Sequence, residues 1–373
     1  MTLAAWLHNL DPVLWQPFSW LTIRWYGIAY LLGFFVAYLL LRWLSRRGAT
    51  PIPRVRAADV IITAALAAVV GGRLGYVLFY KPQALVTFYA QFPYWDILKL
   101  WGGGMASHGG MIGVLIAAWI VSRGFPRPDG TREGRTHVLH VLDRLALIAP
   151  PGLLLGRLAN FVNGELLGRI VAPAGAPAPW WAVKYPQEVL ERPLELSQEQ
   201  WIGLSRAMGV PLLDADNSSD RFDAAYQQLV QALHEGSAHA ATVLHQYLNA
   251  RHPSQLYQAA AEGVVLGVVV WVIAYRPRRA GVTAAWFLMV YGALRIVTEF
   301  WRLPDSHLLT ARIAGLSRGQ WLSATMIVMG AWLLWHVHRK GTPMFKGWGR
   351  QEPEEASAGA TSAPASAGST IRP

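Results

Sequence analysis

The residues that could do chemistry are concentrated in one segment, GRLANFVNGELLGR, at residues 156–169. If this segment is helical, residues at steps of three, four and eight place their side chains on nearly one face. Those residues are Arg157, Asn160, Gly164, Glu165 and Gly168. The face would carry a guanidinium, an amide and a carboxylate, with glycines that let a helix or a ligand approach the backbone. A polar helix end with small packing residues fits the spacing equally well, so spacing alone leaves both interpretations open.

A second polar group lies in the apolar segment YGALRIVTEFWR, residues 291–302. In a helix its members fall within a sector of roughly 80° on an otherwise apolar surface. They are Tyr291, Arg295, Glu299 and Arg302. An arginine near the centre of a membrane helix costs about 2.5–3.5 kcal/mol, so it needs partners or a wet cavity. The alternative is an internal Arg295–Glu299 pair that only packs helices, but it leaves the other two residues unexplained.

The third candidate is His108, within WGGGMASHGGMIG at residues 101–113. Glycines on both sides let the backbone bend and approach a ligand. A histidine titrates at about pH 6.5, so it is suited to accept a proton at neutral pH. A lone histidine at a membrane boundary is also often structural, but the glycines favour a catalytic role. The histidine spacing predicts no metal site. Because the chain has no cysteine, any thiol in the chemistry must come from a substrate.

The composition is that of a membrane protein. The 373 residues are 53% hydrophobic and 15% charged, with 18 tryptophans, and they contain apolar runs of about 20 residues. The runs cover about 20–44, 57–80, a segment ending near 121, 138–155, 255–275, 282–301 and 320–337. We therefore expect an all-α polytopic membrane protein of about seven transmembrane helices with an inserted extracytoplasmic head domain. The net charge of +11 lies in short loops between the runs, which argues against nucleic-acid binding.

The expected domain boundaries follow the apolar runs. Residues 1–157 would hold four spans with an N-terminal periplasmic segment, and residues 254–340 would hold three more. Between them lie residues 158–253, here called the head segment, with polar stretches near 187–208 and 221–248 that are typical of helices. Residues 341–373 end in Ala, Ser, Gly and Pro, so we expect a disordered cytoplasmic tail.

The arginine-rich loops predict the orientation. Loops after the first, third, fifth and seventh runs are rich in Arg or Lys and are expected in the cytoplasm, with the N-terminus outside and the C-terminus inside. One external loop departs from this rule, because it holds Arg302, Arg312 and Arg318. Residues 156–169, His108 and Arg302 would then share the outer leaflet and form one site. Guanidinium groups bind phosphate bidentately, so a phospholipid headgroup is the expected substrate.

The segment GRLANFVNGELLG resembles the signature of the prolipoprotein diacylglyceryl transferase family, GRxGNFxNxExxG, with Ala159 where the family has glycine. Further blocks resemble that family in the same order: RWYG, GGRLGYVLFY, SHGGMIG, RHPSQLY and YGALRIVTEFWRLPD. The resemblance implies a transferase of the bacterial inner membrane that carries out the first step of lipoprotein maturation. It would move the diacylglyceryl group of phosphatidylglycerol to the lipobox cysteine in a prolipoprotein signal peptide, forming a thioether and releasing glycerol phosphate, without a cofactor. We refer to residues 156–169 as the signature segment.

The resemblance also suggests roles for the candidate residues. His108 would be the base, and Arg157 and Arg295 would bind the phosphate. The expected substrate-binding residues are Arg157, Asn160, Asn163, Glu165, Gly168, Tyr26, Tyr291, Glu299 and Arg302. Two other classes of protein stay open: an anion transporter, which also places arginines on membrane helices, and a receptor that only binds lipoprotein precursors. Only the enzyme would form a covalent product.

Overall fold

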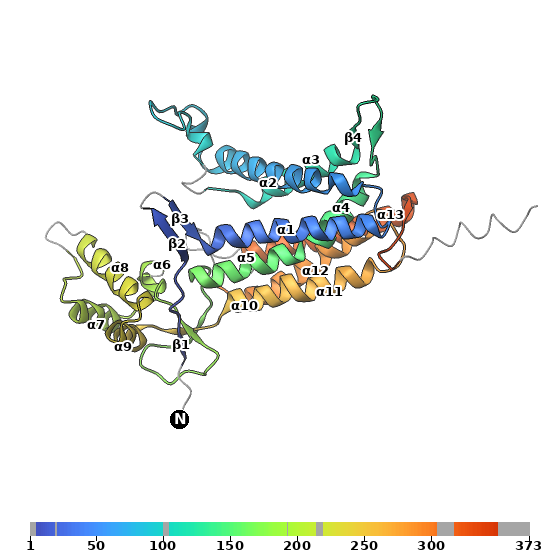
Figure 1. Cartoon of the computed structure of the whole chain (residues 1–373). Helices are drawn as coiled ribbons and strands as arrows, with labels where there is room; N and C mark the ends of the chain where they lie inside the picture. Colours follow the sequence, from blue (N-terminus) through green and yellow to red (C-terminus); the bar gives the residue numbers. More distant parts are fainter. Residues whose placement is uncertain are drawn as a thin grey trace, which may run out of the picture. The chain divides into compact units, whose positions relative to one another are not determined.

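The computed structural model describes residues 5–18, 21–99, 104–191, 193–213, 219–303 and 317–349. Helices dominate the described chain (Figure 1). They are α1 (Trp25–Arg46), α2 (Ala57–Tyr80), α3 (Ser107–Ser122), α4 (Val138–Ile148), α5 (Pro150–Asn163), α6 (Glu188–Glu191), α7 (Gln198–Met208), α8 (Asp220–His234), α9 (Ala238–Tyr247), α10 (Ser254–Gln258), α11 (Leu266–Ile273), α12 (Val282–Glu299) and α13 (Arg318–Lys340). A π-helical segment, Ala259–Val265, joins α10 to α11.

Four helical stretches in the described part of the chain are long and apolar enough to cross a membrane. They are Trp25–Arg46, Arg54–Tyr80, Ser254–Ile273 and Val282–Glu299. The bent pair formed by α4 and α5 would be a fifth. The third predicted span corresponds to α3, which has only 16 residues. The chain is therefore a helical membrane protein with four or five such stretches, and the seven spans predicted from the sequence are not established.

The fourth apolar run is not one continuous helix. The sequence predicts a single span over 138–155, but α4 ends at Ile148, α5 begins at Pro150, and their axes differ by 42°. Pro150 has no backbone N–H to donate, and its ring clashes with the preceding turn of a continuing helix. A proline fits the first position of a new helix instead. The signature segment is consequently on a helix with its own direction.

The head segment contains strands as well as helices. A four-stranded sheet in the order β1-β7-β8-β6 combines β1 (Trp6–Leu7), β6 (Ile170–Ala172), β7 (Val183–Lys184) and β8 (Ala250–Arg251). The fold is therefore not purely α-helical. Strand β1 comes from the N-terminus and pairs in parallel with β7, so the predicted boundary at residue 158 leaves out part of this sheet.

The predicted helices of the head segment pack on one another. Helices α7, α8 and α9 share an apolar core in which Leu204, Phe222, Tyr226 and Leu244 are fully buried. Residues 13–18 and 21–24 form a separate hairpin of β2 (Val13–Phe18) and β3 (Leu21–Arg24) that precedes α1.

Residues just after α13 pair and pack with other parts of the chain, whereas the sequence predicts a disordered tail from residue 341. Strand β10 (Met344–Phe345) pairs with β9 (Arg278–Arg279). The Trp348 indole Nε1 donates to the Trp271 carbonyl at 2.7 Å, and its ring contacts Tyr275. We call residues 342–349 the C-terminal segment. The remainder of the predicted tail, from residue 350, lies outside the described residues.

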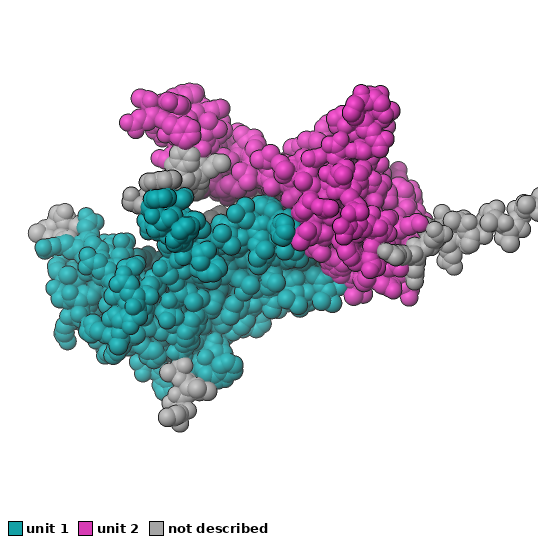
Figure 2. Space-filling view, in the orientation of Figure 1, with its two compact units in different colours: residues 1–37, 148–269, 287–331 teal, residues 38–147, 270–286, 332–373 magenta. Residues whose placement is uncertain are grey.

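Contacts divide the chain into two units whose residues interleave in the sequence (Figure 2). The first comprises residues 1–37, 148–269 and 287–331, and the second comprises residues 38–147, 270–286 and 332–373. Within the second unit α2 packs closely on α3, because glycines line their contact: a methyl group added at Gly75 would lie 2.9 Å from Gly109 Cα. All residues of the arginine cluster described below belong to the first unit.

Candidate active site

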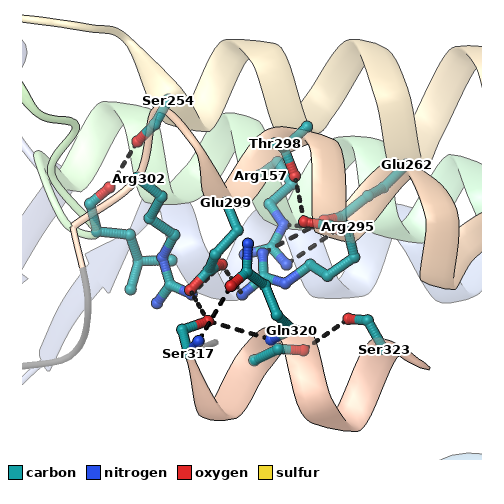
Figure 3. Close-up of polar contacts among 12 residues, drawn as sticks. Arg157, Ser254, Glu262, Arg295, Thr298, Glu299, Arg302, Ser317, Gln320 and Ser323 are labelled. Atoms are coloured by element: carbon teal, nitrogen blue, oxygen red, sulfur yellow. Dashed lines mark hydrogen bonds and ion pairs between the residues drawn. The ribbon is translucent and has the colours of Figure 1, made fainter. Parts of the chain in front are cut away.

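Two of the predicted arginines share one carboxylate. The guanidinium of Arg157, on α5, donates from Nε and Nη2 to Glu262 Oε2, both at 2.9 Å. Arg295, on α12, places Nη1 3.4 Å from Glu262 Oε1. Figure 3 shows the contacts of the Glu262 carboxylate with both guanidiniums. Because Glu262 is fully buried, this arginine bridge holds three charged groups together inside an apolar bundle.

Glu262 belongs to this charged cluster, but the sequence pattern did not single it out. It lies in the apolar stretch AAAEGVVLG and has no basic residue within its own helix, so no local pattern indicated a pair. Its position in an apolar helix could have indicated a partner elsewhere in the chain, because an unpaired carboxylate in a membrane helix is unfavourable by about 2.5–3.5 kcal/mol. Its partners come from two other helices, and only the tertiary structure identifies them.

Glycines place Glu262 at this position. The next residue, Gly263, lies against Leu154 of α5, where an added methyl group would be 2.5 Å from the Leu154 Cβ. One turn later Gly267 lies against Pro150. The absence of side chains lets the two helix backbones approach closely. The carboxylate beside Gly263 therefore meets Arg157, which lies one turn after Leu154.

The bridge continues into a second set of charges at the C-terminal end of α12 and just after it. Arg295 Nη2 and Arg302 Nη1 each lie 3.7 Å from Glu299 Oε2, and Ser317 Oγ donates to Glu299 Oε1 at 3.3 Å (Figure 3). The predicted Arg295–Glu299 pair therefore exists, but it is one contact of a larger network. Three guanidiniums and two carboxylates leave one formal positive charge. Such an arginine cluster can hold a phosphate that carries one negative charge.

The signature segment is helical only as far as Asn163. Gly164 has φ +68°, the left-handed backbone conformation that commonly ends a helix. The Glu165 N–H donates to the Asn160 carbonyl at 3.0 Å, and the Gly164 N–H donates to the Phe161 carbonyl at 3.0 Å. The prediction that Glu165 and Gly168 continue the helical face is therefore wrong. Glycine at this position favours the left-handed conformation and ends the helix.

The turn nevertheless brings Glu165 back to the predicted amides. Asn160 Nδ2 donates to one carboxylate oxygen of Glu165 at 3.2 Å, and Asn163 Nδ2 donates to the other at 3.1 Å. Asn160 Nδ2 also lies 3.5 Å from the Tyr26 hydroxyl of α1. The Tyr291 side chain lies close to the Arg157 guanidinium. Both predicted tyrosines are thus in contact with the signature segment.

Residues 251–255 (RHPSQ) stabilise the turn at residues 164–166 that ends α5, which we call the signature turn. Ser254 Oγ donates to the Leu166 carbonyl at 2.8 Å, and Gln255 Nε2 donates to the Glu165 carbonyl at 2.5 Å. Leu166 has φ +59°, which is uncommon for a residue with a side chain. Two side-chain hydrogen bonds to adjacent carbonyls therefore fix a turn that its own sequence disfavours.

Gly168 and Arg302 meet through their backbones. They form an antiparallel bridge, flanked by hydrogen bonds from Arg169 N to the Trp301 carbonyl (2.9 Å) and from Leu303 N to the Leu167 carbonyl (3.1 Å). The carbonyl of His252 occupies the space where a side chain on Gly168 would lie. This bridge holds the chain that follows α12 against the signature segment.

A buried ion pair of the head segment, Arg251 with Glu188, also contacts the signature segment at Gly168. Arg251 is fully buried and donates to Glu188 at 2.5 Å, to Glu195 at 2.9 Å and to the Gly168 carbonyl at 3.2 Å. Burial raises the pKa of Glu188, and the adjacent Arg251 opposes that increase. Since removal of either partner would leave a buried charge unpaired, this pair fixes the chain where it leaves the head segment.

His108 lies in the other unit. It is the second residue of α3, and its ring contacts Phe79 at 5.5 Å and Tyr80 at 6.2 Å between centroids. Arg73 of α2 is buried and donates to the carbonyls of Ile97 and Asp96. Arg73 therefore stabilises a loop. The role of His108 as base remains a prediction.

Among the described residues, no group of three or more His, Cys, Asp or Glu side chains is arranged to hold a metal ion. The guanidiniums of the arginine bridge can bind and orient an anion, with the amides and the carboxylate of the signature turn beside it.

Comparison with known proteins agrees with this chemistry. Residues 12–336 match the model of the prolipoprotein diacylglyceryl transferase family. A phosphatidylglycerol–prolipoprotein diacylglyceryl transferase from Bdellovibrio bacteriovorus is 36% identical over 360 residues, which cover 92% of this chain and 97% of that protein. Relatives with the same name from Neisseria gonorrhoeae (38% over 324 residues; 87% of this chain, 94% of the relative) and Burkholderia multivorans (38% over 348 residues; 90% and 97%) are similar throughout.

Proposed function

The chain belongs to the prolipoprotein diacylglyceryl transferase family, and on that premise we propose that it transfers the diacylglyceryl group of phosphatidylglycerol to a prolipoprotein lipobox cysteine. The observation that carries the proposal to particular residues is the arginine bridge, in which Arg157 and Arg295 share Glu262. Two guanidiniums held in a membrane bundle are suited to a phosphodiester at the surface of a lipid bilayer.

The reaction follows from the bonds that change. The cysteine sulfur attacks the diacylglycerol carbon bonded to the phosphate oxygen, a carbon–sulfur bond forms, and the carbon–oxygen bond breaks. The electron pair leaves with glycerol phosphate, whose developing charge Arg157 and Arg295 stabilise. The thiol, with a pKa of about 8.5, must also lose its proton. His108 is the proposed base.

The other site residues orient these groups. Asn160, Asn163 and Glu165 form the turn beside the arginine bridge, and Tyr26 and Tyr291 shape the space next to it. Gly168 leaves room for the chain to pass His252. Glu299 holds Arg302 and Arg295 in the second set of charges. Each of these residues is proposed to bind or position the phospholipid.

A reconstituted transfer assay tests the function. Purified protein, phosphatidylglycerol vesicles and a lipobox peptide should yield a peptide heavier by one diacylglyceryl group. Arg157→Ala and Arg295→Ala should lose this product, whereas Arg206→Ala, at an exposed arginine of α7, should retain it. A transporter or a precursor receptor would form no thioether, so absence of product with the wild-type protein would refute the proposal.

The base assignment needs its own measurement. His108→Gln should lower the rate at neutral pH and remove the acidic limb of the pH–rate profile, because glutamine does not titrate in that range. An unchanged rate and profile would show that another group, such as water or a different residue, accepts the thiol proton.

We also propose seven membrane crossings in the bacterial inner membrane, with the head segment and N-terminus outside and the C-terminus in the cytoplasm. The distribution of arginine among the loops supports this orientation. Because the chain has no cysteine, single cysteines can be introduced without background labelling. A membrane-impermeant maleimide should label Ala238→Cys in intact spheroplasts and Thr131→Cys only after lysis. The reverse pattern would invert the topology.

A further inference from the structure

Gln258 is a fully buried amide without a partner. Its exposed fraction is 0%, and within the described chain neither its Nε2 nor its Oε1 has a hydrogen-bond partner. A buried donor or acceptor left unpaired costs about 1–3 kcal/mol. Both ends of this carboxamide are therefore available to a molecule that is not part of the chain.

The position of Gln258 places it beside the arginine bridge. It is the last residue of α10 and precedes Glu262 by four residues, which is about one helical turn, so the two side chains leave the helix on neighbouring parts of one face. The contacts of Gly267 with Pro150 and of Gly263 with Leu154 show that this helix runs antiparallel to α5. Positions 267 and 263 face positions 150 and 154. The same antiparallel register places position 258 opposite position 159, which is Ala159.

The residue opposite Gln258 in this register is Ala159, a small buried residue that lies between Arg157 and Asn160 in the sequence of α5. A carboxamide at this level has the arginine bridge on one side and the signature turn on the other. A ligand whose phosphate binds the arginines would extend the groups attached to that phosphate toward the amide.

We propose that Gln258 binds the hydroxyl groups of the headgroup glycerol and so selects a phospholipid with a diol headgroup. The assignment rests on the proposed function, because it names the part of the substrate that this residue recognises. A carboxamide donates through its NH2 and accepts through its oxygen, and a hydroxyl can do both, so the two groups pair reciprocally. An ammonium headgroup has donors only, and it would also meet the positive charge of the cluster.

The experiment compares two lipids of equal charge. Transfer to a lipobox peptide is measured from phosphatidylglycerol and from phosphatidylpropanol, whose headgroup has the same phosphodiester and no hydroxyl groups. The wild-type protein should favour phosphatidylglycerol by roughly ten- to a hundredfold in kcat/KM, because the analogue leaves a buried amide unpaired. Gln258→Leu should lower the rate with phosphatidylglycerol to that of the analogue and leave the analogue's rate unchanged.

Controls separate this role from a structural one. Gln258→Met, of closer shape, should behave like Gln258→Leu, and it serves if the leucine variant does not accumulate. Gln246→Leu, at an exposed position of α9, should keep the wild-type preference. If the Gln258 variants keep that preference, or lose rate equally with both lipids, the amide binds water or packs and the assignment is wrong. If the wild-type protein forms no thioether from either lipid, the proposed function itself fails.

Discussion

Glu262 determines how the two arginines of the site are held before substrate binds. An arginine in a membrane helix is costly unless it is paired, and one buried carboxylate pairs two of them here. The same contacts orient both guanidiniums toward the Glu262 carboxylate. A bound phosphodiester would then find its two binding groups already in position, which lowers the ordering cost of binding.

At this scale we predict that Glu262→Gln weakens catalysis without unfolding the protein. The amide keeps the shape of the side chain but removes the charge that orders both arginines. Hydrogen bonds to charged groups contribute about 1.5–3 kcal/mol, so kcat/KM should fall by roughly 10- to 100-fold. The measurement is the thioether assay, with Glu199→Gln on the exposed surface of α7 as the matched control. Equal rates for the two variants would contradict the prediction.

His8 predicts a pH dependence of stability. It is fully buried beside β1, and its Nε2 lies 2.7 Å from the Phe161 carbonyl. Burial lowers its pKa to about 4 from 6.5. The unfolded chain therefore takes up this proton below about pH 6.5 while the folded chain does not, so stability decreases as the pH falls from 6.5 to 4. The loss should approach about 3 kcal/mol.

Thermal denaturation in detergent at pH 7.5 and pH 5 checks this effect. His8→Gln should reduce the difference between the two melting temperatures, because glutamine has no charge to gain. His239→Gln, at an exposed histidine of α9, should leave the difference unchanged. A full wild-type difference in the His8 variant would assign the pH dependence to other groups.

At the scale of elements, the ends of helices decide the geometry of the site. Helix α5 could have carried the polar residues along one face, but its left-handed end at Gly164 turns Glu165 back onto Asn160 and Asn163. A helix places residues three and four apart on one face. This turn instead brings Glu165 to residues two and five positions earlier in the chain, Asn163 and Asn160. The close contact of α5 with the π-helical segment is likewise a property of elements, because glycines permit it.

Gly164→Ala tests the importance of this helix end. Gly164 and Gly209 both end helices with φ +68°, so alanine should cost each site about 1 kcal/mol or more in backbone strain. At Gly209 an added methyl group has open space, whereas at Gly164 it would collide with the Gln187 side chain. Both variants should melt at a lower temperature, and only Gly164→Ala should lose most of its transfer rate. Similar transfer rates in both variants would argue against a positioning role for the turn.

At the scale of the whole molecule, the two ends of the described chain contribute to its folding units. Strand β1 completes the sheet of the head segment, and the C-terminal segment packs within the second unit. Trp348 contacts the rings of Trp43, Trp271 and Tyr275, beyond the last residue of the family match at 336. Apolar rings and one indole hydrogen bond thus anchor a segment that the sequence assigns to a disordered tail.

Trp348→Ala should therefore destabilise the protein and leave KM for phosphatidylglycerol nearly unchanged. Loss of a large aromatic side chain from such packing typically costs about 3 kcal/mol or more. The melting temperature in detergent should fall, while KM for phosphatidylglycerol stays within about twofold because the arginine bridge belongs to the other unit. Trp180→Ala, at a tryptophan that is 67% exposed, is the control. An unchanged melting temperature would show that the segment does not anchor the fold.

The sequence by itself determined the class of protein and the positions of its main apolar helices, and it singled out the arginines and amides that the structure brings into contact. These features follow from composition, periodicity and a signature with many fixed positions, which act over a few residues. Only the tertiary structure decided that Glu262 joins Arg157 to Arg295, that Glu165 returns to the amides through a turn, and that β1 belongs to the head sheet. Those contacts link residues that are distant in the chain or related by a glycine turn, and they depend on which helix surfaces can approach one another closely.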